Sequence, residues 1–171
     1  MKLTIRDTAI FGMLGALMYA SKILMELLPN VHLIGVFTIA ITVVYRKKAL
    51  YALYTFVFLT GLFGGFAMWW LPYLYIWLPL WGAAMLLPKD MPRKIAPVVY
   101  MLVCSAHGFL YGTLYAPAQA LLFGLSFDAT LAWIAAGLPF DCIHGISNFF
   151  CGLLVVPIIS ALRIASGSHR G

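Results

Sequence analysis

Long apolar stretches alternate with short polar breaks along most of this chain of 171 residues. A helix that crosses a bilayer needs about 20 mostly apolar residues, and most of these stretches are close to that length. The pattern predicts an all-α integral membrane protein with six transmembrane helices, at about 8–28, 33–45, 50–68, 73–87, 95–115 and 138–162. The second stretch is short for a full span, and tilting or sharing the preceding turn would accommodate it.

The segment between the last two predicted helices follows the pattern least well. Residues 118–136 are apolar, but Gly124, Ser126 and Asp128 interrupt the run. We expect a hairpin of short helices on the outer face here, because a seventh span would place the C-terminal arginines outside the cell. The whole chain, 1–171, is then a single transmembrane domain.

Basic residues cluster at alternate breaks between the apolar stretches. Lys2 and Arg6 precede the first predicted helix, and Arg163 and Arg170 follow the last. Two internal clusters complete the set: Arg46, Lys47, Lys48, Lys89, Arg93 and Lys94. The intervening breaks contain no Lys or Arg, so the positive-inside rule predicts that both termini are cytoplasmic. The first apolar stretch has no small-residue cleavage site, and we expect it to remain in the product.

Composition argues against several classes of protein. Apolar residues make up 64% of the chain and charged residues 9%, whereas about 25% of the residues of a soluble domain are charged. The net charge of +6 lies where membrane topology explains it, so we do not expect nucleic acid binding. The sequence contains no phosphate-binding loop, zinc-protease motif or nucleophile elbow, and its cysteines lack metal-ligand spacing. We therefore expect no cofactor, no metal and no nucleotide hydrolysis by the chain itself.

Polar side chains share one face of the last predicted helix. Asp141, His144 and Asn148 are at i, i+3 and i+7, which puts them on a common face. On the preceding helix, His107 and Tyr111 are at i and i+4. Burying such groups in a membrane is expensive, so each is expected to face a cavity or a polar partner. These five residues are candidates to bind a substrate, and the alternative is a polar network that orders the outer ends of the two helices.

Two tryptophans lie deep in the predicted helix 73–87. Trp77 and Trp81 are one turn apart, so their indole rings would either stack on a flat ligand or pack in the core. Both interpretations stay open from the sequence, and both residues are candidates for substrate binding.

The first predicted helix has a face nearly free of side-chain bulk. Gly12, Ala16 and Ala20 recur at four-residue spacing, which lets another helix approach closely. That other helix belongs either to this chain or to a partner protein. Near the outer end of the same helix, Lys22 and Glu26 are at i and i+4 and are expected to form an ion pair.

These features together resemble the substrate-binding S components of energy-coupling factor (ECF) transporters. The run from Gly137 to Asn148 resembles the Gly-x-Pro-Phe-Asp-x-x-His-x-x-x-Asn segment of many such proteins. Leu-Pro-Asn-Val-His-Leu at 28–33 and Tyr-Arg-Lys-Lys-Ala-Leu-Tyr at 45–51 are similar to the region from the first to the third helix of this group. Six helices, chain length and topology also match.

The resemblance implies a multi-pass protein of a prokaryotic cell membrane that takes up a vitamin or related micronutrient. It implies docking onto a transmembrane coupling subunit with two ATPases, through the face formed by Gly12, Ala16 and Ala20. The mechanism of the family is toppling, in which the S component rotates in the bilayer and carries its occupied pocket to the cytoplasmic side. The outer turn after the first helix is short here, so part of the role of a lid would fall to residues 116–136.

The residues of the candidate pocket restrict the substrate without identifying it. One lysine, no arginine, two or three carboxyl groups and many aromatic rings would match a strongly anionic molecule poorly. A flat, neutral or weakly cationic heterocycle fits better, such as a queuosine precursor, an indole, a pyrimidine or a pterin.

Two other functions remain as alternatives. A self-sufficient permease is disfavoured by the short chain and the lack of inverted repeats. An intramembrane enzyme would use His107, Asp141 and His144 around a metal, but their spacing is not diagnostic.

Overall fold

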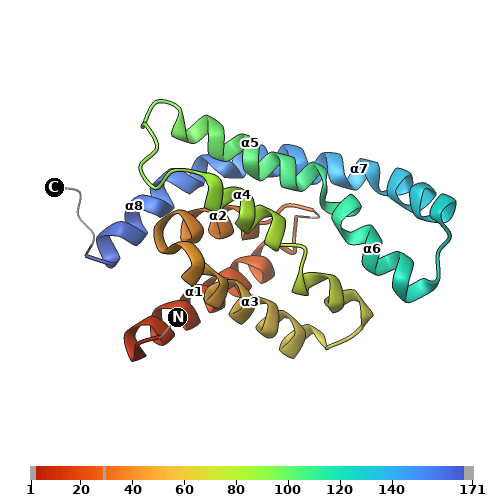
Figure 1. The fold of residues 1–171 in the computed structure, drawn as a ribbon, viewed down its shortest axis with the longest axis horizontal. Coiled ribbons are helices and arrows are strands. Elements are labelled where there is room, and N and C mark those ends of the chain that lie inside the picture. The colour runs from red at the N-terminus through yellow and green to blue at the C-terminus, as the bar shows by residue number, and fades with distance from the viewer. Residues whose placement is uncertain (1–2, 29, 168–171) are drawn as a thin grey trace.

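The structure is a computed structural model that describes residues 3–28 and 30–167, and these residues form helices without any strand. The described residues form eight α-helices with three short 3-10 helices between them, and Figure 1 shows their arrangement. The α-helices are α1 Ile5–Met25, α2 Ile34–Tyr45, α3 Ala49–Gly64, α4 Leu78–Leu86, α5 Ala96–Phe109, α6 Tyr111–Phe123, α7 Phe127–Cys151 and α8 Val155–Ala165. The 3-10 helices are η1 Arg46–Lys48, η2 Met68–Leu74 and η3 Gly152–Leu154. The all-helical prediction is confirmed for these residues.

Three helical stretches among the described residues are long and apolar enough to cross a membrane. They are Ile5–Met25, Ala96–Phe123 and Phe127–Ala165, of which the second joins α5 to α6 and the third joins α7 to α8. These stretches are compatible with a membrane protein. The predicted spans 33–45, 50–68 and 73–87 correspond to the shorter helices α2, α3 and α4.

Helix α2 is the centre of the bundle. All residues from Ile34 to Val43 are buried, and α2 contacts α1, α3, α4, α5, α7 and α8. A helix that is apolar on every side is stable only when it is enclosed. Helix α2, with 12 residues, therefore lies inside the protein.

Helix α1 packs against α3 through one side only. The Cα atom of Gly15 lies so close to α3 that a Cβ added there would be 2.8 Å from the carbonyl oxygen of Ala52. The helix begins at Ile5, earlier than the predicted position near 8, because Thr4 and Asp7 form a capping box that satisfies free N–H groups at its start. Its predicted end at Pro29 lies outside the described residues, as do Lys2 and Arg170.

Proline chemistry divides the predicted helix 73–87. Pro72 lies within η2, and α4 begins only at Leu78 with Pro79 in its first turn. Proline has no N–H to donate and is tolerated best at a helix start. Pro79 lies in the interior of the predicted range 73–87, whereas in the structure it marks the beginning of a helix.

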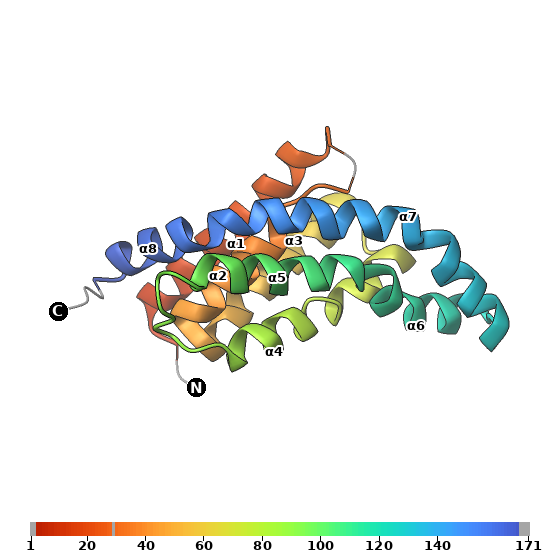
Figure 2. The same cartoon turned by 90° about the horizontal axis from the view of Figure 1, so that it is seen from above.

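Helices α5 and α7 run side by side along the molecule, as Figures 1 and 2 both show. Their backbones meet at Gly108, where an added Cβ would be 2.7 Å from the carbonyl oxygen of His144. Ser105 strengthens the same contact, because its hydroxyl donates to the Gly145 carbonyl at 2.8 Å. Helix α7 is therefore fixed against α5 at the level of His107 and His144.

The predicted helix 95–115 is broken at Leu110, and the last predicted helix begins far earlier than expected. Helix α6 starts at Tyr111 and turns away from α5. Helix α7 starts at Phe127 rather than near 138, since the Ser126 hydroxyl caps it by accepting from the Ala129 N–H at 3.2 Å. The expected hairpin is thus formed by α6 and the first half of α7, with a turn at Gly124 in the left-handed conformation (φ +63°).

The basic clusters lie at one end of the bundle. Arg46 donates to the carbonyl oxygens of Met85 and Leu87, which links the cluster after α2 to the end of α4. Lys48 contacts Asp7 at 2.9 Å, near the start of α1. Arg163 contacts Asp90 at 3.2 Å, near the end of α8. These contacts join the two internal clusters and both terminal helices into one basic end.

Candidate functional site

Five aromatic side chains meet at the end of α2 that lies away from the basic end. They are His32, Trp77, His107, Tyr111 and His144, and we call them the ring cluster. The ring centroids of His32 and His144 are 4.7 Å apart, as are those of Tyr111 and His144. Trp77 stacks on His107 with 5.4 Å between centroids and 28° between the ring planes. The structure therefore brings together four of the candidate residues from the sequence and adds His32.

Each member of the ring cluster comes from a different part of the fold. His107 lies on α5, Tyr111 is the first residue of α6 and His144 lies on α7, while Trp77 directly precedes α4. His32 belongs to the loop before α2, which is tied to α7 by a hydrogen bond from the Ser147 hydroxyl to the Asn30 carbonyl at 3.1 Å. The cluster is thus built where the ends of several helices converge.

His32 was missed in the sequence analysis, which treated residues 29–32 as a short outer turn. A histidine in a turn carries no helical periodicity, so the argument from shared helix faces does not reach it. One signal could have pointed to His32: it lies in the segment 28–33, which is similar to the corresponding region of the S components.

The polar atoms of the ring cluster are buried but only partly paired. His107 Nε2 is 2.9 Å from the Ile76 carbonyl oxygen, and a carbonyl only accepts, so Nε2 carries the proton. In the neutral ring Nδ1 is then an acceptor. That atom, the Trp77 indole N–H and both ring nitrogens of His32 are buried without a hydrogen-bond partner. Buried polar groups are normally paired, so the cluster has the hydrogen-bonding capacity to hold a polar molecule.

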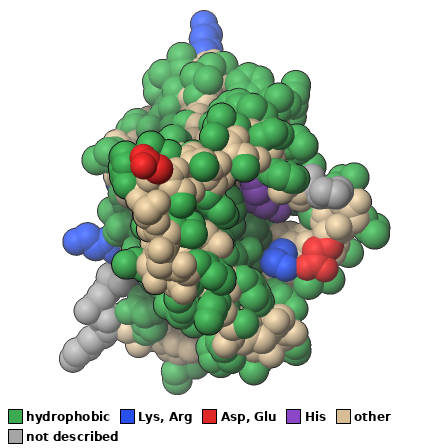
Figure 3. Space-filling model, turned by 90° about the vertical axis from the view of Figure 1, so that its right-hand side faces the viewer, with side chains coloured by type: hydrophobic (Ala, Val, Ile, Leu, Met, Phe, Trp, Pro, Cys, Tyr) green, Lys and Arg blue, Asp and Glu red, His purple; other side chains and the backbone are tan. Residues whose placement is uncertain are grey.

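Charge is scarce around the ring cluster. Lys22, near the end of α1, forms an ion pair with Glu26 at 2.6 Å, as the sequence predicted. Burial of the ring nitrogens, together with the charges of the neighbouring His144 and His107, lowers the pKa of His32 to about 3. His32 is therefore neutral near pH 7. Figure 3 shows a histidine side chain at the bottom of a recess in an otherwise largely apolar face.

Asp141 stabilises the fold beside the ring cluster. Its Oδ1 accepts from the Gly112 N–H at 2.9 Å, and its side chain is buried. This bond satisfies one of the free N–H groups in the first turn of α6, so the carboxylate holds α6 at its angle to α5. The contact agrees with the alternative raised from the sequence, in which Asp141 belongs to a polar network at the helix ends.

Asn148 lies one turn further along α7, toward the basic end. Its side-chain NH2 group donates to the Cys104 carbonyl at 3.4 Å, and its Oδ1 is buried without a partner. It forms none of the ring contacts of the cluster. Asn148 therefore lies beneath the cluster as a buried acceptor between α7 and α5.

Trp81 lies apart from the ring cluster. Its side chain lines a narrow crevice between α1, α2, α3 and α4 together with Met18, Thr38, Ile41, Thr42, Ala49 and Leu53. One helical turn moves a residue about 5.4 Å along the axis, and this displacement takes Trp81 toward the basic end. Of the two tryptophans, only Trp77 contacts the histidines.

The small residues of α1 are on its uncovered side. Ala16 and Ala20 are exposed, and Gly12 is half-buried with open space beside its Cα atom. The residues that pack inward against α3 are instead Phe11, Gly15 and Met18. Within the residues that the structure describes, Ala16 and Ala20 therefore remain uncovered.

No group of three or more His, Cys, Asp or Glu side chains is arranged to hold a metal ion in the described ranges 3–28 and 30–167. His107, Asp141 and His144 do not form such a group. Comparisons with protein-family models, with curated proteins and with solved structures found no match.

Proposed function

We propose that this chain is the substrate-binding S component of an ECF-type transporter in a prokaryotic cell membrane. In this role it captures a vitamin-like heterocycle and delivers it to a transmembrane coupling subunit with two ATPases. The observation that carries the proposal is the ring cluster, where neutral aromatic residues and unpartnered polar atoms converge at one end of a helical bundle. The resemblance of residues 137–148 to the family adds to it.

The proposed topology has six spans with both termini in the cytoplasm. The basic end, linked through Arg46, Lys48 and Arg163, supports this orientation because positive residues favour the cytoplasmic side. Helix α2 has 12 residues and a length of about 18 Å, less than the hydrocarbon core of about 30 Å. The loop that carries His32 then lies below the outer membrane surface, so the ring cluster is a recessed site reached from outside.

The substrate that fits the ring cluster is flat, uncharged and able both to donate and to accept hydrogen bonds. Indole and imidazole rings favour stacking with planar partners. The Trp77 N–H requires an acceptor, while His107 Nδ1 requires a donor. A nitrogen heterocycle with amino or oxo groups supplies both. A strongly anionic substrate is disfavoured because no free basic side chain is part of the cluster.

The proposed route of delivery is toppling in the bilayer. The face formed by Gly12, Ala16 and Ala20 is smooth enough for a coupling helix to approach closely, and both Ala16 and Ala20 are exposed on it. ATP hydrolysis by the partner ATPases would reset the complex, since the chain has no phosphate-binding loop of its own.

Co-purification from the source cells tests the proposal. The tagged protein is extracted in a mild detergent and analysed by native mass spectrometry for bound subunits and a retained small molecule. An S component recovers a coupling subunit, two ATPases and a heterocycle of the expected kind. If the protein is recovered alone and transports substrate by itself in liposomes, it is a self-sufficient permease and the proposal is wrong.

A further inference from the structure

A second pocket lies at the basic end, far from the ring cluster. It has a volume of about 380 Å³ and is formed by the segment that joins α4 to α5, by the start of α5 and by one side of α8. Pockets that bind small molecules are roughly 300–1,000 Å³. None of its lining residues belongs to the ring cluster, so any ligand it takes is separate from the transported substrate.

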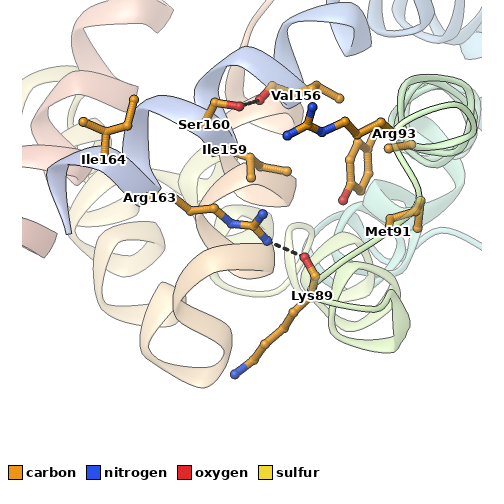
Figure 4. A pocket seen from close by; sticks show the side chains of 10 residues that line it. Lys89, Met91, Arg93, Val156, Ile159, Ser160, Arg163 and Ile164 are labelled. Atoms are coloured by element: carbon orange, nitrogen blue, oxygen red, sulfur yellow. Dashed lines mark hydrogen bonds between the residues drawn. The ribbon is translucent and has the colours of Figure 1, made fainter. Parts of the chain in front are cut away.

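Three cations line this pocket. Lys89 and Arg93 come from the joining segment and Arg163 comes from α8. Figure 4 shows the guanidinium groups of Arg93 and Arg163 directed into the space between the segment and α8. Arg163 is held in place, because it donates to the Lys89 carbonyl and contacts the carboxylate of Asp90 at 3.2 Å. Even with Asp90 counted, the positive charges outnumber the negative, and guanidinium groups match the geometry of phosphate oxygens.

The same two elements also line the pocket with apolar side chains. These are Met91 of the joining segment and Val156, Ile159 and Ile164 of α8, and the Ile164 side chain is 66% exposed. A small hydrophilic anion would gain no favourable contact from these apolar side chains. A molecule that joins an anionic head to a hydrocarbon chain fits both halves of the pocket.

The position of the pocket along the candidate membrane spans agrees with such a ligand. It adjoins Ala96, the first residue of one candidate membrane span, and Ile164, close to the last residue of another. If these helices cross the bilayer, their ends lie at the level of the lipid headgroups. Basic pockets between helix ends at this level bind anionic lipid headgroups.

We propose that this pocket binds the phosphate group of an anionic phospholipid, with Arg93 and Arg163 on the phosphate and the acyl chains along α8. This binding goes beyond the proposed transport function and does not depend on the identity of the substrate. It would fix the joining segment and α8 relative to the membrane surface.

The test uses the full-length protein in an uncharged detergent and measures lipid binding by native mass spectrometry. Dioctanoyl phosphatidylglycerol provides the anionic lipid, dioctanoyl phosphatidylcholine the same chains without net charge, and inorganic phosphate the anion without chains. We expect phosphatidylglycerol to bind at least about fivefold more tightly than the other two, as one well-placed basic residue contributes about this factor. Equal binding of phosphatidylcholine, or phosphate binding as tight as that of phosphatidylglycerol, would overturn the proposal.

Variants locate the binding. Arg93→Gln removes one pocket cation, whereas Lys94→Gln makes the same charge change at the adjacent exposed residue, which does not line the pocket. We expect Arg93→Gln to weaken phosphatidylglycerol binding about fivefold and Lys94→Gln to weaken it less than about twofold. Equal losses in the two variants would mean diffuse attraction to the basic end and would refute a specific pocket.

Ser160→Trp gives a second, independent check. Ser160 is exposed and lines the pocket, so an indole ring there fills the space without changing any charge. We expect loss of lipid binding with an apparent melting temperature, measured without lipid, close to that of the wild type. A folded Ser160→Trp variant that keeps full lipid affinity would contradict the proposed position of the ligand.

Discussion

The carboxylate of Asp141 and the backbone of Gly112 are in direct contact, with Oδ1 accepting from the Gly112 N–H at 2.9 Å. A Cβ added to Gly112 would be 2.5 Å from Asp141 Oδ2, a distance that real side chains do not tolerate. The angle between α5 and α6 thus depends on a residue without a side chain on one helix and a buried carboxylate on another. This angle determines where Tyr111 joins the ring cluster.

Gly112→Ala is expected to destabilise the protein by about 1–3 kcal/mol, because it displaces a buried hydrogen-bonded carboxylate. The measurement is the apparent melting temperature in detergent. Gly137→Ala is the matched control on α7, since an added Cβ there meets nothing within 4 Å. Equal melting temperatures for both variants would show that the Asp141 contact does not hold α6.

Trp77→Phe is expected to weaken binding of the co-purifying heterocycle about fivefold or more, because it removes one hydrogen-bond donor worth about 1 kcal/mol while keeping an aromatic ring. Trp81→Phe makes the same change outside the ring cluster and should leave the affinity nearly unchanged. Isothermal titration of the purified variants measures both. A larger loss in Trp81→Phe would place the substrate in the crevice between α1 and α4 instead.

His144→Ala and Asn148→Ala test how deep the site extends. Loss of a hydrogen bond to the substrate is expected to cost about 1–3 kcal/mol of binding free energy. An effect of His144→Ala alone would limit the substrate to the level of the ring cluster, and an effect of both would extend it to the unpartnered Oδ1 of Asn148. Unchanged affinity in both variants would move the binding site elsewhere in the protein.

Ala16→Trp is expected to abolish uptake in cells while leaving the substrate affinity of the isolated protein nearly unchanged. The bulky ring would stand on the exposed small-residue face and block a closely approaching partner helix. Ile146→Trp, on the exposed surface of α7, controls for added surface bulk and should preserve uptake. A fall in substrate affinity of the isolated Ala16→Trp protein would show that this face does not serve docking alone.

The stability of the protein is expected to fall as the pH decreases below the ordinary histidine pKa of about 6.5. The pKa of His32 is lowered to about 3 in the folded protein, so the unfolded chain binds the proton more readily. From about pH 7.5 to about pH 5.5 this single group should cost about 1.4 kcal/mol. His32→Gln should reduce the corresponding drop in apparent melting temperature, and an identical pH dependence would refute the role of His32.

Helical periodicity allowed much of this arrangement to be predicted. The bounds of α2 agree closely with the predicted 33–45, because the length of an apolar stretch and the polar residues on either side of it are properties of the local sequence. The shared face of Asp141 and His144 likewise follows from their spacing. Both residues lie where α7 meets α5 and α6, which is why His107 and Tyr111 were found as their neighbours.

The remaining features depend on contacts between distant residues. The break at Leu110 lies between Gly108 and Gly112, which weaken a helix without setting its new direction, and the direction of α6 is held by the distant Asp141. His32 has no helical neighbours that would reveal its direction. Trp81 is one helical turn from Trp77 and so lies on the same side of the helix. The local sequence does not show which of the two tryptophans is at the same height as the histidines of α5 and α7.

The close contact of Gly108 with α7 makes His107 and His144 parts of one rigid body. Neither helix can slide or separate without losing a backbone contact that admits no side chain between them. If the whole subunit rotates, as proposed, the distance between His107 and His144 would therefore stay the same. A bound molecule would move together with its site and would not pass from one site to another. Under the proposed transport function, release of the molecule would then require movement of the elements outside this pair, which are the loop of His32 and the segment before α4.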